Sequence, residues 1–392
     1  MSAMTRGERH RVLGYRLSGH NLSERLPAER MLEAAGACGV QNTPPGSAAL
    51  SLLARVDGLT PEMLRSSLLD RSMIEAWSMR ASPHLYPTAL ASVFGRCLVP
   101  DDRFFSDVVI GIVPLLDEMD LDVSSAYAMA EQAVKAELDG TEMPKAELAV
   151  LSARRMASML NAERREAWEQ DSGIGRGITM GEAIVRFALY LMGMRGVVCF
   201  AEHRDGRSPL VLTEQWLGHD VDEADCRQLV ERYLRCYGPS TERYFGEWSG
   251  AGIEHATALW RLSEERMSEV IVNGRTMWLL DEQVEEFEGA QLPAGARLLP
   301  PHDPYLQQRD RAILVPQQEH RRELWRTSGS PGAVLCDGEI VGIWRPRKKG
   351  TDLRLDVRTY GTLPEEAIEN IVKEANLMAP FRKVASVNVA FV

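Results

Sequence analysis

Apolar residues recur at helical spacing in three short segments near the start of the chain. The first segment runs from residue 27 to Gly39, where glycine suits a helix end, and the second covers residues 47–56. The third opens at Thr60-Pro61-Glu62, which offers an N-cap, a first-turn proline and a first-turn acid. β-forming residues follow at 73–79 and 83–86, on either side of a turn at 80–82. Three helices followed by a hairpin is the order of a winged helix.

The order of helix and then hairpin occurs twice more. A strongly apolar helix at 180–194 precedes strands at 197–201 and 210–212, with a turn at Asp205-Gly206 between them. Helices at 223–236 and 253–262, with a capped start at residues 239–241 between them, precede strands at 270–272 and 276–280 around Asn273-Gly274, a strong hairpin signal. A hairpin at 333–344, a strand at 353–357 and a helix at 364–377 close the chain.

These patterns predict a mainly α fold with small β wings, built from tandem winged-helix units plus a C-terminal β region. At 392 residues the chain is too long for one ordinary core. We expect a first winged helix with a motif loop at 1–100, an acidic helical linker region at 101–170, further winged helices at 171–220 and 221–290, and a C-terminal β region with one helix at 291–392.

The distribution of charge along the chain affects the expected binding to phosphate in two regions. The net charge is −11, which argues against non-specific binding to polyphosphate. However, the stretch 101–148 alone carries −9, with twelve acids against three bases, so the rest of the chain is nearly neutral. Residues 345–358 hold six bases and only two acids. We call Arg345, Arg347, Lys348 and Lys349 the basic strip; it suits contact with DNA phosphate, although a solvated strand edge is an equally good interpretation.

The six cysteines lie far apart, with no CxxC pair and no Cys/His cluster at zinc spacing. We therefore expect reduced core thiols, no metal site and no cofactor. Neither a signal peptide nor an apolar stretch of membrane-spanning length is present, so we expect a cytoplasmic protein with no membrane partner.

Familiar catalytic signatures are missing, namely the GxSxG elbow, the P-loop and HExxH, and the glycine run 173–177 is best interpreted as a flexible turn before a helix. The informative stretch is Gly39-Val40-Gln41-Asn42-Thr43-Pro44-Pro45. Further distinctive blocks follow in order at residues 50–55, 70–80, 83–85, 212–217, 232–241, 248–250, 298–303, 309–311 and 334–338. Together these blocks resemble the AlkZ-like family of bacterial DNA glycosylases, the relatives of YcaQ, and they cover most of the chain.

The resemblance implies tandem winged helices around duplex DNA and a catalytic motif of Gln, any residue, then Gln or Asp, at Gln41-Asn42-Thr43. Gln41 matches the first motif position, whereas Thr43 departs from the second. Residues two apart in an extended segment point the same way, so two polar side chains could hold one water against a sugar. Thr43 offers only a short hydroxyl in place of an amide or carboxylate, which leaves three outcomes open for catalysis: weakened, retargeted or lost.

Other family blocks supply second-tier candidates. The resemblance places Asn42, Arg80 and His84 near the motif, as residues that support the fold or approach DNA. In the block at 298–303, Asp303 is better interpreted as a structural turn anchor than as an acid catalyst. Without the family match, Gln41 and Asn42 would be taken for a polar loop, and His84 for a structural histidine.

Two functions remain open. The first is a monofunctional glycosylase that hydrolyses the N-glycosidic bond of N7-alkylated purines, bulky or crosslinked ones included, in duplex DNA. The second is a winged-helix DNA-binding protein or regulator that has lost catalysis, which Thr43 and the acidic net charge favour. In both cases we expect a monomer whose partner is duplex DNA and which is nucleoid-associated when bound.

Overall fold

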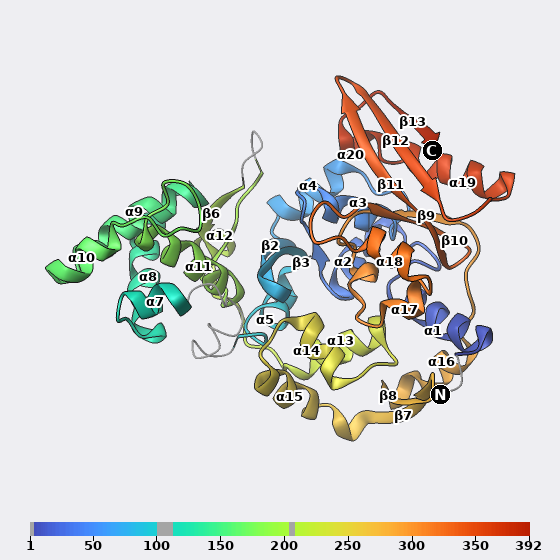
Figure 1. Cartoon of the computed structure of the whole chain (residues 1–392), viewed down its shortest axis with the longest axis horizontal. Helices are drawn as coiled ribbons and strands as arrows, with labels where there is room; N and C mark the ends of the chain where they lie inside the picture. The colour runs from blue at the N-terminus through green and yellow to red at the C-terminus, as the bar shows by residue number, and fades with distance from the viewer. Residues whose placement is uncertain (1–3, 100–112, 204–207) are drawn as a thin grey trace.

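The computed structural model describes residues 4–99, 113–203 and 208–392. Residues 113–203 and 208–217 form a lobe that projects to the left in Figure 1, while the N-terminal helices, residues 227–324 and the C-terminal sheet form the larger body to its right. None of the helices in these described ranges is long and apolar enough to span a bilayer.

The N-terminal part of the larger body is helical. Its helices are α1 (Arg6–Gly19), α2 (Met31–Gly36), α3 (Ser47–Leu53), α4 (Pro61–Leu69) and α5 (Ala91–Phe94). As predicted, Thr60 caps α4, its hydroxyl accepting a hydrogen bond from the N–H of Met63 at 3.2 Å. Helix α1 was not predicted, because its buried face includes Arg16, a residue that sequence patterns place on the surface.

The third predicted wing is a separate two-stranded sheet, whereas the first two do not stand apart but join in one six-stranded sheet. Its strands are β1 (Val40–Gln41), β2 (Met73–Ser78), β3 (Ser82–Pro87), β4 (Met143–Pro144), β5 (Val198–Phe200) and β6 (Pro209–Leu212), in the order β1-β3-β2-β5-β6-β4. The first hairpin meets the second where Glu75 pairs with Phe200 across β2 and β5. The ring of Trp77 on β2 packs 4.6 Å from that of Phe200, so aromatic packing supports the junction. The predicted turn at Asp205-Gly206 lies outside the described residues.

Helices cover this sheet within the lobe. They are α7 (Val113–Glu118), α8 (Val123–Leu138), α9 (Lys145–Ala157), α10 (Ala162–Trp168), α11 (Met180–Met194) and α12 (Thr213–Leu217). The α11 helix is apolar almost all round and packs against α8, α9 and β2, as expected for a helix at the centre of a core. Helices α8 and α9 lie in the acidic part of the chain and bury alanines against this core.

A third group returns to the larger body. It comprises α13 (Arg227–Tyr237), α14 (Glu242–Ser249), α15 (Ile253–Arg261), β7 (Met267–Val272), β8 (Arg275–Leu280) and α16 (Val284–Gly289). The predicted hairpin turn at Asn273-Gly274 is confirmed, because both residues have positive φ and Val272 pairs with Arg275. Aromatic rings of α13, α14 and α15 pack together and fix the three helices.

The C-terminal β region is a five-stranded sheet with helices beside it. Its strands are β9 (Ala296–Leu299), β10 (Gly332–Cys336), β11 (Glu339–Lys349), β12 (Asp352–Thr359) and β13 (Ser386–Phe391), in the order β13-β12-β11-β10-β9. The helices are α17 (Arg311–Leu314), α18 (Gln318–Leu324), α19 (Glu365–Asn376) and α20 (Ala379–Arg382). Strand β11 is longer than predicted, since the basic strip continues the strand and pairs with β12.

Two buried ion pairs fasten the segment 303–310 to the N-terminal helices. Asp303 is fully buried and accepts from both terminal nitrogens of Arg55 at 2.8 Å, and from the N–H of Tyr305 at 2.9 Å. Arg16 forms the same two-point contact with Asp310, at 2.7 and 2.8 Å. Asp303 is therefore a structural anchor, as its sequence context predicted, and the two ion pairs fix the segment against Arg55 and Arg16.

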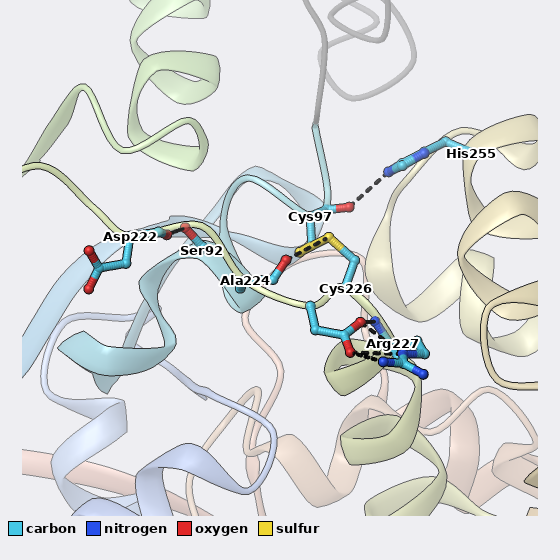
Figure 2. Close-up of a disulfide and its surroundings, with 8 residues drawn as sticks. Ser92, Cys97, Asp222, Ala224, Cys226, Arg227 and His255 are labelled. Atoms are coloured by element: carbon cyan, nitrogen blue, oxygen red, sulfur yellow. Dashed lines mark hydrogen bonds and ion pairs between the residues drawn. A yellow bond between two sulfur atoms is a disulfide. The ribbon is translucent and has the colours of Figure 1, made fainter.

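The prediction that all six cysteines are reduced is wrong for one pair. Cys97, which follows α5, forms a disulfide with Cys226 at the start of α13 (Figure 2). His255 on α15 also contacts this junction, its Nε2 lying 2.8 Å from the carbonyl oxygen of Cys97. Sequence spacing could not reveal the bond, because the two cysteines are 129 residues apart. The other four cysteines are free and buried.

Candidate active site

Gln41 ends the short strand β1 and is held by a charged neighbour. The strand pairs with β3, so that Gln41 lies opposite His84 on the same face. Gln41 is only 6% exposed, and its Oε1 accepts a hydrogen bond from Nη2 of Arg80 at 3.1 Å. The Nη1 of the same guanidinium donates to the carbonyl oxygen of Trp248 at the end of α14. The amide of Gln41 therefore has a fixed orientation before any ligand binds.

Arg80 is placed by an unusual backbone turn. Arg80 and Ala81, between β2 and β3, both have positive φ, at 55° and 52°. Such conformations cost non-glycine residues ~1–3 kcal/mol each and concentrate at functional sites. Gly250, which caps α14, presses on this turn, because a Cβ there would lie 2.9 Å from the N and Cα of Arg80. Burial, followed by the charge of Arg309, lowers the pKa of Arg80 to about 10, so the guanidinium stays charged at neutral pH.

His84 is neutral in this environment. It is 2% exposed, and burial, followed by the charge of Arg80, lowers its pKa to about 3. Its Nδ1 lies 2.8 Å from the carbonyl oxygen of Ser82. In the neutral ring Nδ1–H donates that hydrogen bond, which leaves Nε2 as an acceptor. His84 therefore presents a hydrogen-bond acceptor on the face that also carries Gln41.

Asn42 points to the opposite side and closes the motif loop. Its Nδ2 donates to Oε1 of Glu75 at 2.8 Å, and its Oδ1 accepts from the backbone N–H of Gly46 at 2.8 Å. These bonds tie the motif both to β2 and to the start of α3. Glu75 was not singled out in the sequence, where it is one acid within a β-forming run. Burial raises the pKa of Glu75 to about 7, although the hydrogen bond from Asn42 opposes the rise.

Thr43 lies beyond the end of β1 and precedes a cis peptide bond to Pro44. Its side chain is partly exposed, and its hydroxyl makes no hydrogen bond to any residue that the structure describes. The sequence argument assumed that residues 41 and 43 share one face of an extended segment. The strand ends at Gln41, so that pairing stays a prediction.

A group of positive charges lies beside Gln41. Arg309 lies within the anchored segment 303–310, and its Nε and Nη2 atoms are buried without a hydrogen-bond partner among the described residues. The charges of Arg309 and Arg80 interact, and burial and the charge of Arg80 both lower the pKa of His302. Unsatisfied buried guanidinium donors are costly unless an anion reaches them. The two guanidinium groups of Arg80 and Arg309, with the neutral His302 next to Arg80, are referred to as the cationic centre.

An adjoining pocket extends the cationic centre. Its volume is about 250 Å³, and its lining includes His302, Arg311, Trp325 and Arg326. The guanidinium of Arg311 lies 5.0 Å from the ring centroid of Trp325. A larger cavity of about 710 Å³ lies between β6 and α8, but its lining mixes acids with bases and includes no motif residue. The lining of the smaller pocket also includes no motif residue, but it holds bases and no acid and shares His302 with the cationic centre, so it fits an anionic ligand beside that centre.

The basic strip lies on a different sheet from Gln41, and part of its charge is neutralised. Arg347 pairs with Asp356 at 2.5 Å, and Arg354 contacts the same carboxylate at 2.6 Å. Lys348 donates to the carbonyl oxygen of Arg382, and Arg345 donates to that of Gly329. The side chain of Lys349 lies outside the described part of the structure. The structure thus brings together Gln41, Asn42, Arg80 and His84, with Thr43 adjacent, and keeps the strip separate.

Three comparisons with known proteins point to one family. The chain is 26% identical over 362 residues to an interstrand DNA cross-link repair glycosylase of Streptomyces sahachiroi, with 86% of each chain covered. The structure resembles that of the Streptomyces sahachiroi DNA glycosylase AlkZ with a TM-score of 0.75 at 20% identity, covering 98% of this chain and 99% of the other. The family described as DNA glycosylase AlkZ-like matches residues 34–381. The chain therefore belongs to the AlkZ-like DNA glycosylase family.

Proposed function

We propose that the protein is a monofunctional DNA glycosylase that hydrolyses the N-glycosidic bond of N7-alkylated purines in duplex DNA. The observation that carries the proposal is Gln41, buried at the first motif position of the family and held by Arg80 with neutral His84 opposite it. The cross-link repair activity in the name of the Streptomyces relative supports extending the substrates to bulky and crosslinked purines.

The chemistry requires little from the protein beyond positioning. A purine alkylated at N7 already carries positive charge, so the bond from C1′ to N9 breaks with its electron pair moving to the base, which leaves neutral. The sugar passes through an oxocarbenium-like state that captures water at C1′. One oxygen lone pair of Gln41 is taken by Arg80, and the second can accept a hydrogen bond from that water. The Nε2 of His84 offers another acceptor for the same water or for the proton that it loses.

Hydrolysis leaves an abasic site without cleaving the strand, because the motif contains no amine to form a Schiff base with the sugar. The Arg80 charge is held in place by α14, and it would repel an approaching cationic sugar unless DNA phosphate balanced it. The cationic centre can hold such a phosphate. The Nε and Nη2 of Arg309, which have no hydrogen-bond partner among the described residues, suit a phosphate oxygen. We infer that duplex DNA passes over this centre with the damaged nucleotide next to Gln41.

The basic strip is proposed as a second phosphate contact, on the winged-helix plan that the family implies. Its charges are partly paired within the sheet, so its contribution is smaller than its composition suggests. Changing Arg347, Lys348 and Lys349 together to Ala should weaken binding to labelled duplex at low salt, as measured by fluorescence anisotropy. Unchanged affinity would remove the strip from the DNA-binding surface.

The activity is tested by incubating excess protein with duplexes that contain N7-methylguanine or an N7-linked interstrand crosslink. Released base is measured by mass spectrometry, and abasic sites are revealed by alkaline cleavage. We expect base release and strand breaks only after alkali. Binding to every duplex without base release from any of them would contradict the proposal.

The second candidate, a DNA-binding regulator without catalysis, is favoured by Thr43 at the second motif position. A regulator reads sequence, whereas a glycosylase reads damage. Selection from random undamaged duplexes would therefore yield a specific site for the regulator and none for the glycosylase.

A further inference from the structure

One histidine and two cysteines that are far apart in the sequence lie together in the interior, and one of them, Cys38, is close in sequence to the motif strand. His20 follows α1, Cys38 lies between α2 and β1, and Cys236 lies in the last turn of α13. One ligand atom from each residue lies within 4.8 Å of the other two. The residues are 0%, 3% and 1% exposed, so two sulfurs and an imidazole nitrogen converge in the interior.

Their separations suit a tetrahedral metal site. The Sγ of Cys38 lies 3.7 Å from Nδ1 of His20. In a tetrahedral zinc site, with Zn–S of ~2.3 Å and Zn–N of ~2.0 Å, a sulfur and a nitrogen ligand lie about 3.6 Å apart. The carbonyl oxygen of Gly19 lies 3.3 Å from Sγ of Cys236 and is at hand as a fourth donor. The other ligand atoms lie within 4.8 Å of one another and would close toward these tetrahedral distances when the metal binds.

On its Nε2 side the imidazole is held by packing and not by a hydrogen bond. Its ring meets Tyr237 and Tyr305 edge to face, with centroid distances of 4.8 and 5.5 Å. Its Nε2 is buried and has no hydrogen-bond partner among the residues that the structure describes. The two aromatic rings therefore fix the direction of Nδ1, a task that a hydrogen bond to the second nitrogen usually performs in metal sites.

Charge and access are also compatible with a metal. Two thiolates and a neutral imidazole balance a divalent cation, and the two thiol protons leave on binding. The nearby guanidinium of Arg55 is already neutralised by its two bonds to Asp303. Cys236 and Gly19 also line a surface pocket of about 380 Å³, which offers an entry path.

We propose that His20, Cys38 and Cys236 form a structural site for a thiophilic divalent cation, with zinc as the best match to these nitrogen and sulfur donors. Cys38 lies three residues before Gln41, so the metal would tie the motif strand to α1 and α13. The site is independent of the proposed glycosylase activity, and its test does not use DNA.

The first measurement is the metal content of the full-length protein, purified without chelator and analysed by mass spectrometry. We expect one zinc per chain after incubation with zinc and desalting. After the metal is removed with a chelator, Co²⁺ is added as a spectroscopic probe. Thiolate-to-cobalt charge-transfer bands and intense tetrahedral d–d bands should rise to saturation at one equivalent.

Variants identify the ligands. Cys38→Ser and Cys236→Ser should weaken zinc binding by about 100-fold or more and shift the cobalt bands. Cys336→Ser, which alters a free buried cysteine of the C-terminal sheet, is the matched control and should bind as the wild type does. If a cysteine variant does not fold, His20→Gln provides the same test, and the wild-type stoichiometry stands by itself.

Three results would overturn the proposal. They are a wild type that retains no zinc and develops no thiolate–cobalt band, a Cys38→Ser variant with wild-type affinity, and peptide mapping that finds Cys38 bonded to Cys236 as a disulfide in protein purified under reducing conditions. Failure of the glycosylase assay would leave the proposal untouched.

Discussion

Replacing Glu75 with Gln should make the protein more stable, by an amount that grows as the pH rises from about 4.5 to about 7. Burial raises the pKa of Glu75 from 4.5 to about 7 in the folded chain. The folded protein therefore keeps a proton on Glu75 that the unfolded chain loses above pH 4.5, so the stability falls as pH rises from about 4.5 to about 7. A glutamine side chain at this position would keep an oxygen that can accept the hydrogen bond from Asn42 and would never ionise.

The size of the effect follows from the two pKa values. Each pKa unit is worth ~1.4 kcal/mol, so the difference between 4.5 and about 7 corresponds to a ceiling of about 3 kcal/mol above pH 7. The gain of Glu75→Gln over the wild type should grow from below about 1 kcal/mol at pH 5 toward this ceiling at pH 8.

Urea unfolding followed by tryptophan fluorescence at pH 5, 6, 7 and 8 measures the gain. Glu62→Gln removes an exposed carboxylate of α4 and serves as the control for lost charge. A gain that stays constant across this range, or that grows as much for Glu62→Gln, would refute the reasoning about burial.

Three further changes test other parts of the account. Arg309→Gln should weaken duplex binding by about 10-fold and reduce the salt dependence by about one phosphate contact, as measured by anisotropy at several salt concentrations; an unchanged salt slope would contradict a phosphate role. Asp303→Asn should destabilise the protein by about 3 kcal/mol or more, because it leaves the buried Arg55 charge uncompensated, and a melting temperature like that of the wild type would argue against the anchor. Thr43→Gln, which restores the family pattern, should keep or raise excision of N7-methylguanine, whereas a loss of excision would mean that Thr43 has its own role.

Local patterns predicted most of the elements because their signals lie close together in the chain. The Asn273-Gly274 turn needs two positive φ angles, which this dipeptide favours, and the apolar helix at 180–194 appears with the predicted bounds. Helix α1 escaped prediction because its buried Arg16 depends on Asp310, nearly three hundred residues away. The joining of two hairpins into one sheet likewise depends on long-range contacts between β2 and β5.

The residues of the candidate site also fall into two groups, those that the sequence predicted and those that only the fold reveals. Gln41, Arg80 and His84 were found through the family motif, and the structure places them together. Glu75 was missed because its hydrogen bond to Asn42 depends on the pairing of strands, which the sequence of β2 does not encode by itself. Arg309 lies in one of the sequence blocks that resemble the family. Only the fold shows that its Nε and Nη2 are buried without a hydrogen-bond partner among the described residues.

The central claim is that Gln41, oriented by Arg80, positions the attacking water. Its most direct test is the single-turnover rate of base release from an N7-methylguanine duplex, compared between wild type and Gln41→Ala with DNA affinity measured alongside. The account predicts that the rate falls by about 10²-fold or more, the scale of losing one positioning or polarising group, while the affinity changes little. A Gln41→Ala variant that releases base as fast as the wild type would contradict the account.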